Sequence, residues 1–136
     1  MNKSKGFTII ELIVVIAIIA ALAAIVLVNV TGYINKGKDA AMKGNLATLA
    51  STGAAYYDSI HNYTAFCTAN FAAGKPIFDQ TPSATGDKVC NQSATAWAAC
   101  SQELVTTANY WCVDSTGTKK EVTEASCSGF AATVCP

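Results

Sequence analysis

An apolar run over residues 7–28 constrains this chain more than any other part of its sequence. Thr8 and Glu11 are the two residues in the run that are not hydrophobic. A helix needs about 20 apolar residues to cross a bilayer core that is about 30 Å thick. The run therefore predicts a membrane-spanning helix, and Lys3 and Lys5 before it predict a cytoplasmic N-terminus.

Two ordinary interpretations of this run are a cleaved signal peptide and a plain membrane anchor. Ala21-Leu22-Ala23 offers the small residues of a signal-peptide cleavage site, and cleavage there would release a secreted, disulfide-rich binding module. The run continues to Val28, however, and a mature soluble protein rarely starts on such a segment. Glu11 also argues against both interpretations, because a carboxylate costs about 2.5–3.5 kcal/mol at the centre of a membrane helix and less near its end.

Residues 5–12 read Lys-Gly-Phe-Thr-Ile-Ile-Glu-Leu and lead directly into the rest of the apolar run. This pattern resembles the class III signal of type IV prepilins and of type II secretion pseudopilins. The resemblance implies that a prepilin peptidase cleaves the chain between Gly6 and Phe7 on the cytoplasmic side of the membrane. It also implies that the new N-terminal residue, Phe7, is N-methylated.

Glu11 receives a role from the same resemblance. The family implies that the Glu11 carboxylate neutralises the cationic amine of Phe7 in an adjacent subunit during filament assembly. Glu11 lies four residues after Phe7, one helical turn away, so a pair within one subunit is the alternative. Either pair would neutralise two charges that are costly in an apolar bundle.

After the apolar run, the helix is predicted to continue as an amphipathic segment. Apolar or small residues recur there at spacings of three and four: Leu46, Leu49, Gly53, Tyr56 and Ile60. No proline occurs before Pro76, so a single helix over residues 7–60 is expected. Glycine costs about 1 kcal/mol against alanine inside a helix. Four glycines in this stretch indicate either loosening on assembly or close packing: Gly32, Gly37, Gly44 and Gly53.

The C-terminal half of the chain predicts a small head. Residues 67–93 are rich in Thr, Ala, Asn, Gly and Pro and are predicted as a loop. Residues 96–104 and 109–115 are predicted to form a β-hairpin, and residues 119–122 a third strand. The predicted fold class is α+β, with a long N-terminal helix packed on a small antiparallel sheet that carries disulfides.

All six cysteines lie in the predicted head: Cys67, Cys90, Cys100, Cys112, Cys127 and Cys135. An even number of cysteines in a small exported domain predicts disulfide bonds, which compensate for a thin apolar core. The number of possible pairings is fifteen, and the sequence alone does not select one of them. The expected pairs are Cys100–Cys112, which are symmetric about Thr106 in the hairpin, Cys127–Cys135 and Cys67–Cys90.

The sequence contains no pattern for catalysis, a cofactor or a metal site. No two cysteines are spaced as CxxC, and His61 is the one histidine. Asp79, Asp87 and Asp114 are available to calcium but are scattered along the chain, so no metal is expected. Nine lysines balance nine acids and there is no arginine, which argues against a nucleic-acid-binding protein. An enzyme is therefore not expected.

These observations predict a structural subunit of a type IV pilus-like filament, with a pseudopilin of a type II secretion system as the alternative. The cysteine-rich head favours the pilus, whereas residues 36–41 resemble pseudopilin helices. The expected precursor spans the bacterial inner membrane once, and the expected filament is extracellular or periplasmic. Expected partners are further copies of the chain, the inner membrane, the prepilin peptidase, an assembly platform and its ATPase. The predicted regions are the leader (1–6), the transmembrane and filament-core helix (7–28), the amphipathic helix (29–61) and the head (62–136).

Overall fold

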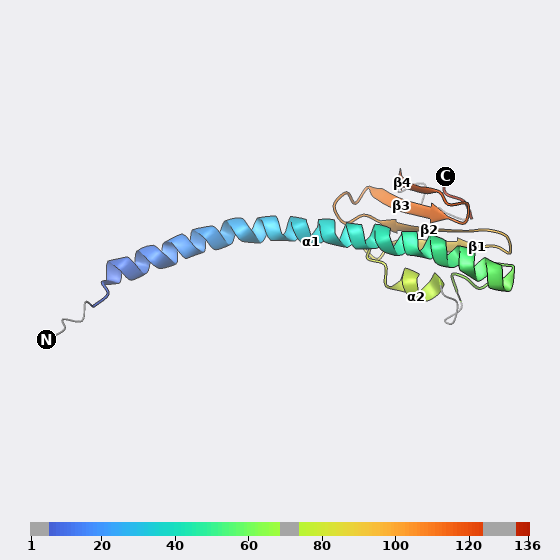
Figure 1. Cartoon of the computed structure of the whole chain (residues 1–136). Helices are drawn as coiled ribbons and strands as arrows, with labels where there is room; N and C mark the ends of the chain where they lie inside the picture. Colours follow the sequence, from blue (N-terminus) through green and yellow to red (C-terminus); the bar gives the residue numbers. More distant parts are fainter. Residues whose placement is uncertain (1–5, 69–73, 124–132) are drawn as a thin grey trace. The chain divides into compact units, whose positions relative to one another are not determined.

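The computed structural model of the chain describes residues 6–68, 74–123 and 133–136. The elements along the chain are α1 (Ile9–Ile60), α2 (Gly74–Asp79), β1 (Lys88–Gln92), β2 (Trp97–Gln102), β3 (Asn109–Asp114) and β4 (Lys119–Thr123) (Figure 1). One long helix and one small sheet confirm the predicted α+β class. The chain divides into two compact units, Met1–Ile34 and Asn35–Pro136, and the second unit contains α2, the sheet and the later part of α1.

α1 is a single uninterrupted helix, as the absence of proline predicts. It ends at Ile60, and the next residue, His61, has a φ of 61° in the left-handed region, which turns the chain away from the helix axis. The His61 N–H donates to the Tyr57 carbonyl oxygen at 2.7 Å and closes the last turn. Asn62 continues the cap, because its side-chain amide donates to the Ile60 carbonyl oxygen at 3.2 Å.

The sheet has the strand order β1-β2-β3-β4, and each neighbouring pair is antiparallel. β2 and β3 form the hairpin that the sequence predicts, with Cys100 opposite Cys112 in the register. β4 is the predicted third strand of this meander and pairs Lys120 with Cys112. Successive side chains of a strand point to opposite faces of a sheet, so Trp97 and Ala99 of β2 share one face and Ala98 and Cys100 share the other.

The predicted loop over residues 67–93 is wrong in two places, because α2 and β1 lie within it. Pro76 sits in the first turn of α2, where a missing N–H costs nothing. The Lys88 ammonium donates to the carbonyl oxygens of Phe78, Asp79 and Thr81, at 2.9, 2.7 and 3.1 Å. These bonds satisfy carbonyls at the end of α2 that have no partner within the helix. Both elements thus depend on contacts between distant residues, which local composition does not reveal.

Side chains are buried on both faces of the central strands β2 and β3. On one face α1 contributes Met42, Leu46 and Leu49, which pack with Trp97 and Val113 of the sheet. The opposite face carries a second buried cluster: Ala98, Cys100, Tyr110, Cys112, Val122 and Cys135. Burial on both sides explains why all six positions of β2 are buried. Much of this core consists of small and sulfur-containing side chains rather than branched aliphatic ones.

The four helical glycines fall into two groups. A Cβ atom on Gly53 would lie 2.6 Å from Trp97 Nε1, so α1 and the indole ring approach each other closely at this position. No atom lies within 4 Å of the corresponding position at Gly32, Gly37 or Gly44. Close packing against Trp97 therefore explains why position 53 is a glycine. Packing within the described protomer does not explain the other three glycines.

Gly53→Ala is expected to destabilise the protein. The added methyl group would overlap the buried, rigid Trp97 ring, and such overpacking costs about 1–3 kcal/mol against a helix-propensity gain of about 1 kcal/mol. Gly44→Ala is the matched control in the same helix and is expected to stabilise the protein by up to about 1 kcal/mol. Thermal unfolding of the detergent-solubilised chain measures both, and equal shifts would contradict the packing assignment.

Candidate processing and assembly site

The expected cleavage site lies just before the helix. Gly6 and Phe7 precede the first helical residue, Ile9, and have no regular secondary structure. Both are exposed, with the Phe7 side chain 79% accessible, and nothing approaches the Cβ position of Gly6 within 4 Å. A peptidase needs an accessible bond outside regular secondary structure, and the Gly6–Phe7 bond has both properties.

The Glu11 carboxylate is held at the start of α1 by Thr8. Its Oε2 accepts hydrogen bonds from the Thr8 N–H at 2.9 Å and from the Thr8 hydroxyl at 2.8 Å. In return, the Glu11 N–H donates to the Thr8 hydroxyl oxygen at 3.3 Å. This reciprocal arrangement is a capping box, which satisfies N–H groups that a helix leaves unpaired in its first turn. In the uncleaved chain Phe7 is still bonded to Gly6, so Glu11 has Thr8 as its partner.

Sequence reasoning missed this cap, although its signal is present. Thr-x-x-Glu directly before an apolar run is the capping-box pattern, and Thr8-Ile9-Ile10-Glu11 matches it. The cap gives Glu11 a structural role before processing. It also fixes the carboxylate one turn from the residue that cleavage would make N-terminal.

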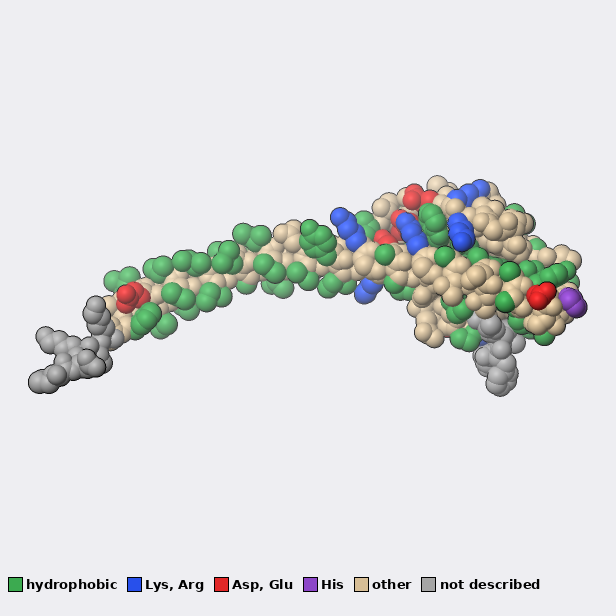
Figure 2. Space-filling view, in the orientation of Figure 1, with side chains coloured by type: hydrophobic (Ala, Val, Ile, Leu, Met, Phe, Trp, Pro, Cys, Tyr) green, Lys and Arg blue, Asp and Glu red, His purple; other side chains and the backbone are tan. Residues whose placement is uncertain are grey.

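The apolar side chains that follow are exposed along the whole first unit. From Ile9 to Ile34 every residue is exposed. Figure 2 shows these hydrophobic side chains covering the helix, with one acidic side chain near its start. In the described part of the chain, α1 is the one helix whose length and apolar composition suit a membrane span. This segment therefore requires lipid or other apolar surfaces around it.

Two disulfides are defined in the second unit. Cys67 is bonded to Cys90, which is the pair expected for the region before β1. Cys112 is bonded to Cys135, and this bond overturns the expected pairs Cys100–Cys112 and Cys127–Cys135. Cys100 is also disulfide-bonded, and Cys127 lies outside the described residues.

The geometry of paired strands explains the error at Cys112. The hairpin does place Cys100 opposite Cys112, as its symmetry predicts. Directly opposed Cβ atoms are about 4.5–5.5 Å apart, however, whereas a disulfide needs about 3.5–4.5 Å. Cys135 packs with the buried residues on the face of the sheet that carries Cys112, so it approaches Cys112 from that face and not from a paired strand.

A buried carboxylate holds the C-terminal residues beside this disulfide. Asp114, 1% exposed, accepts the Cys135 N–H on Oδ2 at 2.9 Å. Its Oδ1 accepts the N–H groups of Thr116 and Thr118 and the Thr116 hydroxyl, at 2.9, 3.1 and 2.6 Å. Burial opposes ionisation, but these hydrogen bonds outweigh it, and the pKa of Asp114 lies below its ordinary value.

The stability of the head is therefore expected to depend on pH through Asp114. Because its pKa is lowered in the folded state, the ionised group stabilises the fold above its ordinary pKa, near 3.9, and this contribution disappears as the pH falls through the folded value. Asp114→Asn puts an NH₂ group against the Cys135 N–H and is expected to cost about 1–3 kcal/mol at neutral pH. The variant should lose less further stability than the parent between about pH 5 and 2. Parallel pH profiles in chemical unfolding would contradict this role.

The acids considered for calcium have separate partners in the structure. Asp79 pairs with Lys75 at 2.6 Å, and Asp87 accepts the Tyr110 hydroxyl at 2.7 Å. Asp114 is saturated by the bonds described above. Across residues 6–68, 74–123 and 133–136, no three His, Cys, Asp or Glu side chains gather in a way that could hold a metal ion.

Comparison with known families finds a similarity at the N-terminus. A family model described as the prokaryotic N-terminal methylation motif matches residues 1–27. The match contains Gly6, Phe7 and Glu11 and supports the type IV pilin and pseudopilin family. No curated protein and no solved structure matches the chain. The motif points to a structural protein rather than an enzyme, and with the apolar part of α1 it fits a membrane-anchored precursor.

Proposed function

We propose that this protein is the structural subunit of a type IV pilus-like filament. The observation that carries the proposal is the Glu11 carboxylate, which Thr8 holds by two hydrogen bonds. Glu11 lies within the methylation motif and is followed by an unbroken apolar segment. A membrane anchor alone has no need for a charge at this position. A subunit that must align with its neighbours does have such a need, because an ion pair between subunits defines their register.

Processing supplies the other half of that pair. A prepilin peptidase hydrolyses the Gly6–Phe7 bond on the cytoplasmic side, and methylation leaves a cationic amine on Phe7. During assembly this amine pairs with Glu11 of a neighbouring subunit. Regions 7–28 of successive subunits then pack together, with further stabilisation from close contacts at Ala17, Ala20 and Ala24. The energy for extraction from the membrane comes from the platform and its ATPase.

The disulfides favour a surface-exposed pilus over a secretion pseudopilin. Cys67–Cys90 and Cys112–Cys135 bind the two ends of the head to the sheet. Covalent links of this kind protect a small domain against shear and proteolysis outside the cell. Electron microscopy of intact cells tests the choice, because long surface filaments support the pilus. Short filaments confined to the periplasm, together with loss of protein secretion on gene deletion, would support the pseudopilin.

Mass spectrometry of the mature N-terminus tests the processing step. We expect a first residue of methylated Phe7. A mature chain that starts at Ala24 would instead identify a secreted module with an ordinary signal peptide. An unprocessed chain that starts at Met1 would contradict the proposed function.

A further inference from the structure

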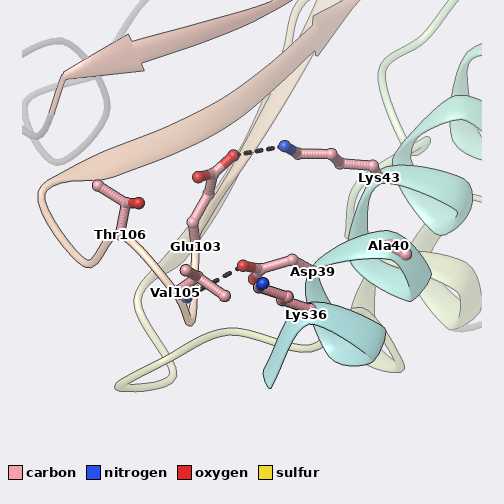
Figure 3. Close-up of a pocket in the computed structure, with 7 residues that line it drawn as sticks. All are labelled: Lys36, Asp39, Ala40, Lys43, Glu103, Val105 and Thr106. Atoms are coloured by element: carbon pink, nitrogen blue, oxygen red, sulfur yellow. Dashed lines mark hydrogen bonds and ion pairs between the residues drawn. The ribbon is translucent and has the colours of Figure 1, made fainter. Parts of the chain in front are cut away.

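The second unit has a pocket at the start of its part of α1. The pocket has a volume of about 360 Å³. Lys36, Asp39, Ala40 and Lys43 line it from α1, and Glu103, Val105 and Thr106 line it from the β2–β3 loop (Figure 3). All seven residues belong to Asn35–Pro136, so the pocket is formed within one compact unit.

The acidic groups of the pocket are already engaged. Asp39, 8% exposed, accepts the N–H groups of Leu104 and Val105, at 2.6 and 3.0 Å. Glu103 is 5% exposed, and its Oε1 lies 2.7 Å from the Lys43 ammonium. Figure 3 shows both carboxylates facing contacts inside the protomer. They also fix the β2–β3 loop against α1, so the pocket is preformed.

The pocket balances two lysines against two acids, but the acids are buried, so the charged side chains exposed at its rim are the lysines. The Lys43 side chain remains 38% exposed although Glu103 is buried, and Lys36 is exposed at the rim. Val105 adds an apolar side chain that is 51% exposed. A fitting partner therefore combines a carboxylate with an exposed aliphatic group.

The other end of α1 carries such a combination. In the last turns of the helix, Ile60 is 49% exposed and Tyr57 is 39% exposed. Asp58 lies beside them, is exposed, and forms no ion pair with any residue that the structure describes. Figure 2 shows lysine side chains over the first turns of this unit's helix, and an acidic side chain next to the histidine at its end.

We propose that the pocket receives the last turn of α1 from a second copy of this chain, with Asp58 facing Lys36 and Ile60 facing Val105. The inference rests on the proposed filament function. Pocket and last turn are different surfaces of one subunit, so the contact is head-to-tail and generates an open helical polymer rather than a closed dimer. They lie about 33 Å apart along the helix at roughly 1.5 Å per residue, so this contact relates subunits displaced along the filament axis.

Charge reversal in the full-length chain, expressed with its assembly machinery, tests this contact. Lys36→Glu and Asp58→Lys are each expected to lower the yield of sedimentable filaments about tenfold, because each places like charges opposite one another. The double variant restores opposite charges and is expected to return to within about twofold of the parent. Lys38→Glu is the matched control: it makes the same charge change two residues away, does not line the pocket, and should leave the yield unchanged.

Disulfide trapping provides a measurement that does not depend on yield. Ala40→Cys combined with Ile60→Cys should form a covalent ladder of subunits on oxidation of filaments, whereas either substitution alone should not. Parent-like yields from both single charge variants, or a ladder absent from the double cysteine variant, would overturn the inference while leaving the filament function intact. A parent chain that forms no filaments would overturn the proposed function, and this contact with it.

Discussion

Glu11→Ala is expected to leave membrane insertion and cleavage after Gly6 intact and to reduce filament assembly to background. Insertion is retained, because the substitution removes a carboxylate that costs up to about 2.5–3.5 kcal/mol in a membrane helix. Cleavage is preserved because Gly6 and Phe7 lie outside the helix and remain accessible. Assembly fails because the Phe7 ammonium of each subunit then enters an apolar bundle without a counter-charge.

The capping box provides a sharper control than alanine alone. Glu11 has two separable properties, its negative charge and its hydrogen bonds to Thr8. Glu11→Gln keeps an amide oxygen that can accept from Thr8, since glutamine also serves in a capping box, but it removes the charge. We expect Glu11→Gln to block assembly as strongly as Glu11→Ala. Thr8→Ala removes the cap, retains the carboxylate, and should impair assembly much less.

Three measurements on each variant separate the steps. Protease accessibility of the head in spheroplasts reports insertion, the mass of the N-terminal peptide reports cleavage and methylation, and the sheared-fibre fraction reports assembly. Normal fibre yield from Glu11→Gln would assign the role of Glu11 to its cap and contradict the intersubunit ion pair. Loss of processing in Glu11→Ala would show instead that the residue acts at the peptidase.

The parts of the fold that the sequence predicts well are those encoded by local pattern. The run over residues 7–28 and the later apolar spacing indicate one long helix, and the structure has one from Ile9 to Ile60. The hairpin follows from two strand-forming segments around a short connection that contains Thr106 and Thr107, and β2 and β3 lie within the predicted limits. In each case, neighbouring residues supply most of the information.

The parts that were missed depend on contacts between residues far apart in the chain. β1 has the polar sequence Lys-Val-Cys-Asn-Gln, and it is a strand because β2 offers a free edge to pair with. α2 has only six residues, fewer than an isolated helix needs, and Lys88 holds its end. The head's second buried face was also not foreseen, because Cys135 reaches it from the end of the chain.

The candidate site likewise has parts that local sequence predicts and parts that depend on contacts between distant residues. Gly6, Phe7 and Glu11 are recognisable from a contiguous motif, whereas the pairing of Cys112 with Cys135 required the topology of the sheet. The same holds for the pocket, because Asp39 meets the β2–β3 loop 65 residues further along the chain. Its residue type gives no hint of this contact, since an aspartate in an amphipathic helix ordinarily belongs to the solvated face.

Removing the Cys112–Cys135 disulfide is expected to be the most damaging change in the head. Replacing both cysteines with alanine releases a loop with a sequence separation of 23 residues, which corresponds to about 3 kcal/mol of lost chain constraint. The Cys67–Cys90 bond spans the same separation and is therefore a matched control for the entropic part. Thermal unfolding of each double alanine variant in detergent, followed by near-UV circular dichroism, measures the loss.

The two variants should lose different amounts of stability, because different contacts remain around each loop once its disulfide is removed. After loss of Cys67–Cys90, the region before β1 remains fixed by Lys88 on the α2 carbonyls and by the Gln92 amide on the Thr64 carbonyl at 2.6 Å. After loss of Cys112–Cys135, residues 133–136 keep the hydrogen bond from the Cys135 N–H to Asp114. Cys112 is also fully buried, so its truncation leaves a cavity beneath the second face. Equal losses would mean that loop entropy alone determines the effect and that the second buried face contributes little to the stability of the head.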